Sequence, residues 1–325
     1  MRRCFLYLIA GSCLLLLFSA GPGSFAVRSL RYVWNLGHIV AFAAFCMLLL
    51  DHWQGLAGKT FFPQMEILLL FGLIAGGLVE VVQAATGGDC SWSDLGRDLI
   101  GCLTASAFFS GRRLMLNKAV RWRVQAATIG LVILAAVPLL LSLADEAMAR
   151  RQFPILGGFE CPLEIDRWEG DARLAIDHGI FATGKASLKM ELNTTRYSGA
   201  TLKYFPGDWQ GYQALRFAIF NPEAVPLKIM CKVADRAHDR SGHRYKDRFN
   251  GSFELNCGWN RILVPMADIE AAPKKRKMDL RQVTQVSLFA AGLKRNRIIY
   301  LDDVRLMRET TGSWEDKKNE KPFSR

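Results

Sequence analysis

The sequence predicts two dissimilar parts, an N-terminal α-helical transmembrane bundle and a C-terminal all-β sandwich. About five long apolar runs fill roughly the first 145 residues. Beyond them, short alternating strands separated by Gly, Pro, Asn and Asp replace helical periodicity. Charge divides in the same way: 12 Lys and Arg against 8 Asp and Glu lie in short clusters up to Arg150, and 30 against 22 are spread evenly after it.

The bundle is predicted over residues 1–146, with helices near 5–20, 33–50, 67–85, 95–110 and 124–143. A spanning helix needs about 20 mainly apolar residues, and shorter ones are tolerated. The 5–20 segment is either a span or a cleaved signal peptide, because its apolar core is short and small residues follow at Ser19-Ala20-Gly21. The 95–110 segment, rich in Gly, Ser and Thr, is either a closely packed span or re-entrant.

Positive charges in the short loops predict the orientation. The largest group precedes the last apolar segment and comprises Arg112, Arg113, Lys118, Arg121 and Arg123. This loop is therefore expected in the cytoplasm, which puts the N-terminus there as well and the β-domain in the periplasm or outside the cell. Arg28 and Arg31 oppose this orientation but are fewer. The expected location is a bacterial inner membrane, with the lipid bilayer as partner.

Ionisable side chains inside the bundle form a candidate polar cluster. A charged group at the centre of a spanning helix costs about 2.5–3.5 kcal/mol on insertion, so it needs a partner or a function. Spacings of three and four residues place members of the cluster on shared helix faces. The cluster comprises His38, Glu80, Gln83, Asp94 and Asp98.

Two interpretations of this cluster remain open. In the first, Glu80 pairs with Arg97, Ser93 or Asp94 caps the next helix, and the cluster only fixes a hairpin. In the second, the cluster lines a polar pocket facing the outer surface, where a carboxylate beside an imidazole moves a proton or binds a lipid headgroup. Spacing alone does not separate them.

Three features of residues 5–115 belong together: Glu80-x-x-Gln83, then Asp94 and Gly101 around DLGRDLIG, and His38 in NLGHIVAFAAF. With these features the segment resembles the VanZ-like family of small bacterial membrane proteins. The resemblance implies a cell-envelope role, since the family is associated with reduced susceptibility to teicoplanin and has no established mechanism.

The sequence departs from the VanZ-like pattern at three places. No Arg follows Gln83, Asp98 stands where an Asn is expected, and Trp34-Asn35 replaces Asp-Lys. These departures leave the implied fold in place and argue against transferring any shared chemistry.

The soluble part is predicted as a β-sandwich over residues 157–308, after a linker at 147–156 and before a disordered tail at 309–325. Five strands alternate most clearly between apolar and polar residues, namely SLKMEL, ALRFAIFN, LKIMCKVAD, NRILVPM and IIYLDDVRL.

Five segments of this domain follow one another in a recognisable order, namely GFE at 158–160, GKASLKM, FPGDWQGYQALRFAIFN, GWNRILVPMADI and YLDDVRL. In this order they resemble a carbohydrate-binding-module jelly roll of the galactose-binding type. Such modules often hold a structural calcium ion between the first and last strands, and Glu160 and Asp302 match those positions here. The alternative is that both are ordinary edge residues.

Sugar binding uses flat rings that stack on pyranose faces. Tyr197, Trp209, Tyr212 and Trp259 are candidates, although Trp209 and Trp259 flank strands where core packing is the alternative. A second candidate is the segment ADRAHDRSGHRYKDRFN, which is either a solvated loop or a ligand or metal site. Its charged and aromatic residues are Asp235, His238, Asp239, His243, Tyr245, Asp247 and Arg248.

Several other features narrow the function. The eight cysteines form no CxxC motif, and Cys231 and Cys257 are either a disulfide pair or free thiols. The net charge of +12 would suit nucleic acid, but in a membrane protein part of it orients helices, so no nucleic-acid partner is predicted. The run Lys274-Lys275-Arg276-Lys277 is a solvated turn or a contact for anionic lipid or wall polymer.

The preferred hypothesis is a cell-envelope membrane protein that displays an external carbohydrate-binding-like module, in a binding or adaptor role toward envelope glycan or a lipid-linked saccharide. One alternative is a membrane enzyme acting on a lipid-linked substrate at His38, Glu80 and Asp94. Another is a structural anchor for the β-domain. The sequence has no nucleophile elbow and no phosphate loop, and calcium is the only cofactor considered.

Overall fold

The computed structural model describes residues 7–8, 11–12, 27–85 and 91–308. The chain divides into two compact units, Met1–Leu143 and Ala144–Arg325, which are described one at a time. Most of the predicted 5–20 segment and the whole predicted tail at 309–325 lie outside the described residues.

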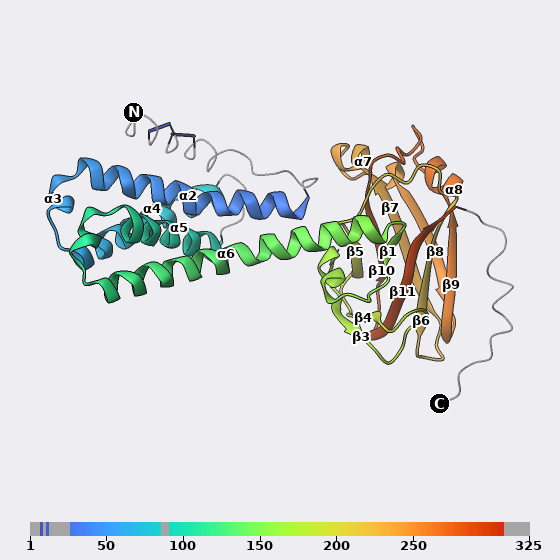
Figure 1. Cartoon of the computed structure of the whole chain (residues 1–325). Coiled ribbons are helices and arrows are strands. Elements are labelled where there is room, and N and C mark those ends of the chain that lie inside the picture. The colour runs from blue at the N-terminus through green and yellow to red at the C-terminus, as the bar shows by residue number, and fades with distance from the viewer. Residues whose placement is uncertain (1–6, 9–10, 13–26, 86–90, 309–325) are drawn as a thin grey trace. The chain divides into compact units, whose positions relative to one another are not determined.

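The first unit is helical (Figure 1). Three of its described helices, α2, α4 and α6, are long and apolar enough to cross a membrane, and they contain the segments predicted at 33–50, 67–85 and 124–143. The segment predicted at 95–110 is instead the 13-residue helix α5 followed by a π-helical turn, so the expected number of about five spans is not confirmed. The elements are α2 (Arg28–His52), α3 (Gln54–Ala57), α4 (Phe61–Ala85), α5 (Trp92–Thr104), η1 (Ala105–Phe109), η2 (Gly111–Met115) and α6 (Lys118–Gln152).

Glycines bring α5 close to both α2 and α4. A Cβ atom on Gly101 would lie 2.6 Å from the carbonyl oxygen of Ile39 in α2. On α4, a Cβ on Gly76 would lie 2.5 Å from Oδ2 of Asp98, and one on Gly72 would lie 2.5 Å from Sγ of Cys102. Small residues therefore permit the close helix packing that membrane bundles use.

Helix α6 has 35 residues and, at 1.5 Å per residue, is about 52 Å long. This exceeds the roughly 30 Å of a bilayer core. Its last residues belong to the second unit, where Asp145 forms an ion pair with Arg167 at 2.7 Å. The predicted linker at 147–156 is therefore absent, because these residues complete α6 and begin strand β1.

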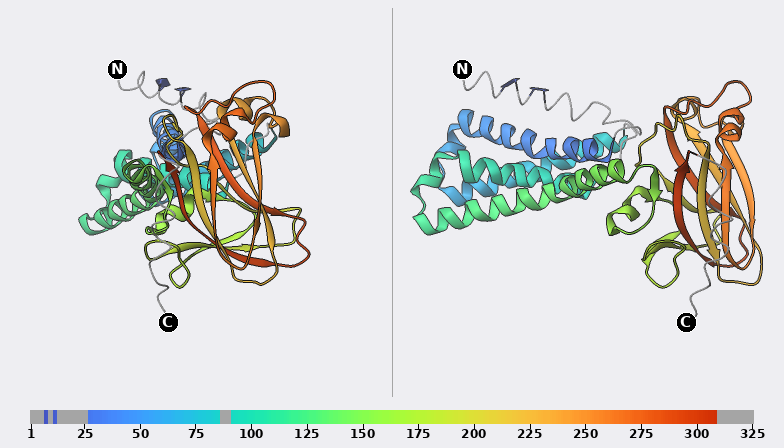
Figure 2. Two further views of the ribbon diagram at one scale, coloured as in Figure 1. Left: turned by 90° about the vertical axis from the view of Figure 1, so that its right-hand side faces the viewer. Right: turned by 45° about the vertical axis from the view of Figure 1, so that its right-hand side comes forward.

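The second unit is a sandwich of two antiparallel sheets (Figures 1 and 2). Sheet A has the order β3-β4-β11-β6-β9, with β1 paired to β11, and sheet B has the order β2-β5-β10-β7-β8. The five predicted strands correspond to β4, β6, β7, β9 and β11. The strands are β1 (Ile155–Gly157), β2 (Trp168–Glu169), β3 (Arg173–Asp177), β4 (Ser187–Leu192), β5 (Tyr197–Leu202), β6 (Ala214–Asn221), β7 (Leu227–Asp235), β8 (Phe249–Leu255), β9 (Gly258–Pro265), β10 (Val283–Ala291) and β11 (Arg297–Met307).

Alternating residues of both sheets fill one apolar core, as the period-2 pattern predicts. Strand β4, for example, buries Leu188, Met190 and Leu192. Cys231 also points into this core while Cys257 is exposed, and both are free thiols, so the possible disulfide is not formed. Burial raises the pKa of Cys231 to about 12.

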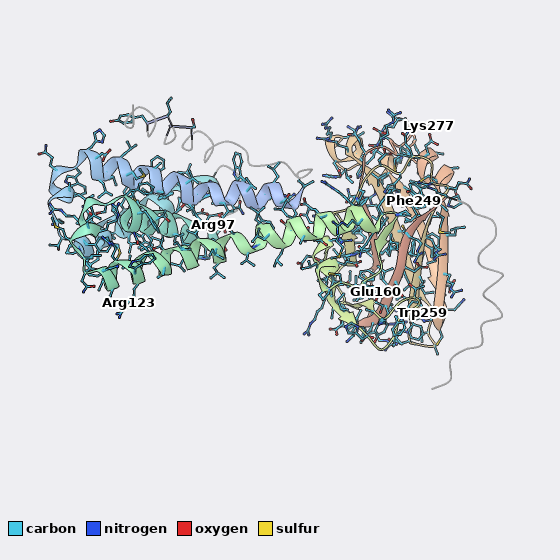
Figure 3. All side chains as sticks on the ribbon, viewed as in Figure 1. Arg97, Arg123, Glu160, Phe249, Trp259 and Lys277 are labelled. Carbon is cyan, nitrogen blue, oxygen red and sulfur yellow. The ribbon has the colours of Figure 1, made fainter. Side chains whose placement is uncertain are left out.

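Four short helices connect the strands. Two of them, α7 and α8, lie toward the same end of the sandwich, where Figure 3 also shows Lys277, and Trp259 lies toward the opposite end. The helices are η3 (Pro162–Arg167), α7 (Arg236–Arg240), η4 (Tyr245–Asp247) and α8 (Met266–Ala271).

Candidate functional site

A buried histidine–aspartate pair lies at the centre of the polar cluster in the helical unit. Nδ1 of His38 on α2 lies 2.9 Å from Oδ1 of Asp98 on α5, and both side chains are almost fully buried. The other oxygen of Asp98 has no hydrogen-bond partner among the described residues and faces Gly76 on α4. The absence of a side chain at Gly76 is what leaves room for the Asp98 carboxylate between the helices.

Glu80 lies beside this pair. Its Oε2 accepts a hydrogen bond from the backbone N–H of Ser91 at 2.6 Å, and its Oε1 is buried with no described hydrogen-bond partner. Glu80 and Asp94 both interact electrostatically with His38 and Asp98. The predicted members His38, Glu80, Asp94 and Asp98 therefore form one cluster.

The expected hairpin contacts differ in detail. Arg97 pairs with Asp94 on its own helix rather than with Glu80. The residue before the first turn of α5 is Ser91, and no side chain caps that end. Gln83 lies one turn beyond Glu80 on α4 and is half-buried.

The charged loop after β7 is held together by one arginine. Arg276 donates to both oxygens of Asp235 at 2.5 and 2.7 Å, and to Oδ1 of Asp247 at 2.8 Å. Burial opposes ionisation of Asp235, but hydrogen bonds from Arg276 and from two backbone N–H groups hold its pKa below the usual value. The Arg276 hydrogen bonds likewise lower the pKa of Asp247. These two carboxylates thus serve the structure of the loop.

The histidines of this loop do not converge on a metal site. His238 is fully buried, and burial lowers its pKa. The exposed ring of His243 packs against it at a centroid distance of 5.5 Å. Among the described residues, no group of three or more His, Cys, Asp or Glu side chains is placed to hold a metal ion.

The aromatic candidates have different positions. Trp209 is fully buried in the core and cannot contact a ligand. Tyr212 is half-buried against Phe153. Trp259 packs with Phe220 on the outer side of sheet A, at a centroid distance of 5.4 Å.

The two carboxylates predicted to hold calcium bind the same loop. Oδ2 of Asp302 accepts the N–H groups of Ala182 and Thr183 at 2.7 and 2.8 Å, and Oε1 of Glu160 accepts that of Lys185 at 2.8 Å. Burial raises the pKa of Asp302 to about 6, although these hydrogen bonds oppose the shift. Calcium takes six to eight oxygen ligands. Asp302 accepts three N–H groups and Glu160 one, and these two carboxylates alone supply fewer oxygens than such a site needs.

The outer face of sheet B combines a half-exposed aromatic ring with polar side chains from neighbouring strands. One row of outward side chains crosses all five strands, and an adjacent row contains Phe289 and Met230. Tyr197, half exposed, packs edge-to-face on Phe289 at a centroid distance of 5.7 Å. The five-strand row consists of Glu169, Thr201, Ser287, Lys232 and Asn250.

Part of the charged loop reaches the edge of this face. The exposed ring of Tyr245 lies under the guanidinium of Arg248, 5.3 Å from the ring centroid. Nε of Arg248 donates to Oδ1 of Asn250 at 3.0 Å, which connects the pair to the five-strand row. Two residues predicted as ligand-binding, Tyr245 and Arg248, therefore adjoin the row, whereas Asp235, His238 and Trp209 are buried away from solvent.

Sequence reasoning found Tyr197 and missed the other strand residues of this face. The segment VTQVSLFAA of β10 alternates, with Val286 and Leu288 in the core and Ser287 and Phe289 outside. That alternation was a usable signal for the outward residues. Which strand lies beside β10 could not be read from it, because β5 and β7 are far away in sequence.

No family model and no curated protein matches the sequence. An exo-β-agarase structure matches with 14% identity and a TM-score of 0.40, over 48% of this chain and 25% of the agarase chain. This chain thus spans about a quarter of that protein.

Two structures of a family 11 carbohydrate-binding module from Clostridium thermocellum also match. The module of the cellulase Lic26A-Cel5E has 16% identity and a TM-score of 0.36, over 47% of this chain and 92% of the module. The module in complex with a β-1,3-1,4-mixed-linked tetrasaccharide has 17% identity and a TM-score of 0.37, over 47% and 94%. These scores are too low to indicate a ligand for this chain, so the candidate face rests on its own geometry.

Proposed function

We propose that this chain is a membrane protein of the cell envelope whose β-sandwich binds a glycan on the outer face of sheet B. The observation that carries the proposal is the half-exposed ring of Tyr197 packed on Phe289, beside a row of polar side chains that crosses the sheet. A binding or adaptor role toward envelope glycan or a lipid-linked saccharide follows.

The chemistry of this face suits sugars for two reasons. Aromatic rings offer flat apolar surface to the C–H faces of pyranoses. The oxygen of the Thr201 hydroxyl, which donates its hydrogen to Oγ of the buried Ser287 at 2.8 Å, and Oδ1 of the exposed Asn250 offer fixed acceptors to sugar hydroxyls. Because these groups project from paired strands, they are held in place before a ligand arrives.

Glycan-array and calorimetric binding of the detergent-solubilised full chain tests this proposal. Tyr197→Ala and Phe289→Ala should each weaken binding about tenfold, because each removes ring surface that stacks on the sugar. The matched control is Trp259→Ala, an aromatic on the outer side of sheet A, which should bind as the unchanged protein does. A blank array, or equal losses in all three variants, would refute the proposed face.

Membrane insertion and orientation are part of the same proposal. The long apolar helices α2, α4 and α6 support insertion, and the positive charges before α6 and in its first two turns favour a β-domain outside the cytoplasm. Cys257 provides the test, since its thiol is exposed in the β-unit. A membrane-impermeant maleimide added to spheroplasts should label the protein, and Cys257→Ser should lose most of the signal. Labelling only after lysis would reverse the orientation.

The VanZ-like assignment of the helical unit also remains a proposal, carried by Glu80, Gln83, Asp94 and Gly101. The close approach of Gly101 to the backbone of Ile39 gives that glycine a packing reason.

A second candidate function is supported by the His38–Asp98 pair. A buried imidazole hydrogen-bonded to a carboxylate is an acid–base arrangement, and ionisable groups in spanning helices often mark function. This unit would then act on a lipid-linked substrate. His38→Gln and Asp98→Asn proteins, at normal expression, should fail to restore the envelope phenotype of a strain that lacks this protein. Glu66→Gln, which changes an exposed carboxylate of α4 outside the cluster, should restore it. Loss of the folded protein in the first two variants would favour a purely structural pair.

A further inference from the structure

Lys232 lies in the middle of the outer face of sheet B and differs from its neighbouring lysines. It is half-buried in the row that crosses the five strands, and its ammonium forms no ion pair among the described residues. Lys203 by contrast pairs with Glu169. Lys228, on the same strand and the same side, is exposed and faces Glu254 of β8 in register.

Arg248 adds a second positive charge close to Lys232. Its guanidinium covers the ring of Tyr245 and donates to Asn250, and it forms no ion pair with a described carboxylate. Burial and the nearby Arg248 lower the pKa of Lys232 to about 8, and burial lowers the pKa of Arg248 as well. Two like charges are therefore held together in a partly desolvated position, an arrangement that costs free energy in the unliganded protein.

Asp239 is the carboxylate whose charge attracts Lys232, but it does not neutralise both Lys232 and Arg248. Asp239 accepts hydrogen bonds from Oγ1 of Thr284 at 2.7 Å and from Nε2 of Gln285 at 2.9 Å, one on each oxygen. Lys232 and Arg248 carry two positive charges against this one negative charge. A neutral sugar on this face would displace water from the two cations without forming an ion pair with either. An anionic group would form ion pairs with both.

We propose that the glycan bound on the outer face of sheet B is acidic, with a carboxylate, sulfate or phosphate that contacts Lys232 and Arg248. This inference rests on the proposed glycan-binding function and names its substrate class. The aromatic pair Tyr197–Phe289 stacks on a sugar ring, and the two cations receive the charge of that sugar or of the next one. A guanidinium suits this role, because it presents several N–H donors in one plane to oxyanions.

The test measures binding of the full chain in detergent to acidic and neutral oligosaccharides of matched length. The acidic probes are oligogalacturonates for carboxylate, carrageenan oligosaccharides for sulfate and phosphorylated gluco-oligosaccharides for phosphate. Cello- and laminari-oligosaccharides are the neutral probes. At least one acidic class should bind about tenfold or more tightly than the neutral probes, since a charge-assisted contact forms only with the former.

Variants separate a specific contact from general electrostatic attraction. Lys232→Met should lose about tenfold or more in affinity for the acidic probe, and Lys232→Arg should recover most of it. Lys228→Met removes the same charge from the same strand and should change affinity less than twofold. The Lys232→Met protein should fold, because the substitution removes a partly desolvated charge and keeps an unbranched stem.

The outcomes distinguish this inference from the function on which it rests. Equal binding of neutral and acidic probes by the unchanged protein would overturn the acidic class and leave glycan binding intact. Equal losses in Lys228→Met and Lys232→Met would also overturn it, as nonspecific charge attraction. Binding of no probe by the folded protein would refute the proposed function together with the inference.

Discussion

The ion pair between Asp145 at the end of α6 and Arg167 at the end of η3 is expected to be a main determinant of the stability of the β-unit. Both side chains are 1% exposed, and Nε and Nη2 of Arg167 lie 2.8 and 2.7 Å from Oδ1 of Asp145. Removing one member of a buried pair leaves the other charge desolvated and unpaired, which costs about 3–5 kcal/mol. Asp145→Ala should therefore lower the unfolding free energy by that amount.

Such a loss corresponds to a decrease in Tm of roughly 10 °C for a unit of this size. Thermal unfolding of the detergent-solubilised chain, followed by tryptophan fluorescence, measures it, because Trp168 and Trp209 are buried in the same core. The control is Lys277→Met, which removes the exposed Lys277–Glu270 pair and should leave Tm unchanged. The double variant Asp145→Leu with Arg167→Met should recover much of the loss. A decrease below about 1 kcal/mol for Asp145→Ala would refute the reasoning.

Three further predictions concern the other sites. Gly76→Ala should destabilise the helical unit by about 1–3 kcal/mol, because its Cβ would lie 2.5 Å from Asp98, whereas Gly77→Ala meets open space and serves as the control in thermal unfolding. The pKa of Lys232 is about 8 in the folded state and about 10.4 in the unfolded state, so between these pH values the unfolded state binds more protons. The unfolding free energy should therefore rise by about 1–2 kcal/mol from pH 8 to pH 10.4, and the Lys232→Met protein should show no such rise. Chelation of calcium should leave Tm unchanged while Asp302→Ala costs about 3 kcal/mol through three unpaired backbone N–H groups; a Tm that rises with added calcium would contradict this.

The local hydrophobic pattern was sufficient to predict the strands that bury one face and the long helices that are apolar all round. The apolar runs in α2, α4 and α6 and the alternation in β4, β6, β7, β9 and β11 are visible in single segments. Strand β5 was missed because YSGATL contains a buried Ser and a Gly in place of bulky residues. The short helix α5 was read as a longer span because Gly101, which serves packing on α2, does not interrupt the apolar run.

The candidate sites were predictable only as sets of residue types. Helical spacing placed Asp94 and Asp98 on one face, but only the fold pairs Asp98 with His38, 60 residues away. In the β-unit, the loop after β7 was predicted as a candidate site because it contains many charged residues and histidines. Arg276 accounts for much of that crowding, and it comes from a turn 29 residues after Asp247. Lys232 was overlooked because one lysine in a strand has no signature until its neighbours across the sheet are known.

The pair of Asp145 and Arg167 also decides where the β-unit begins. A boundary at residue 157, chosen where alternation starts, removes Asp145 and leaves the buried Arg167 without its partner. It also removes the paired residues of β1 before Gly157. A fragment that begins at Ala144 keeps both, so it should unfold at a Tm higher by roughly 10 °C than one that begins at residue 152. Equal Tm values for the two fragments would show that the Asp145–Arg167 pair does not stabilise the β-unit.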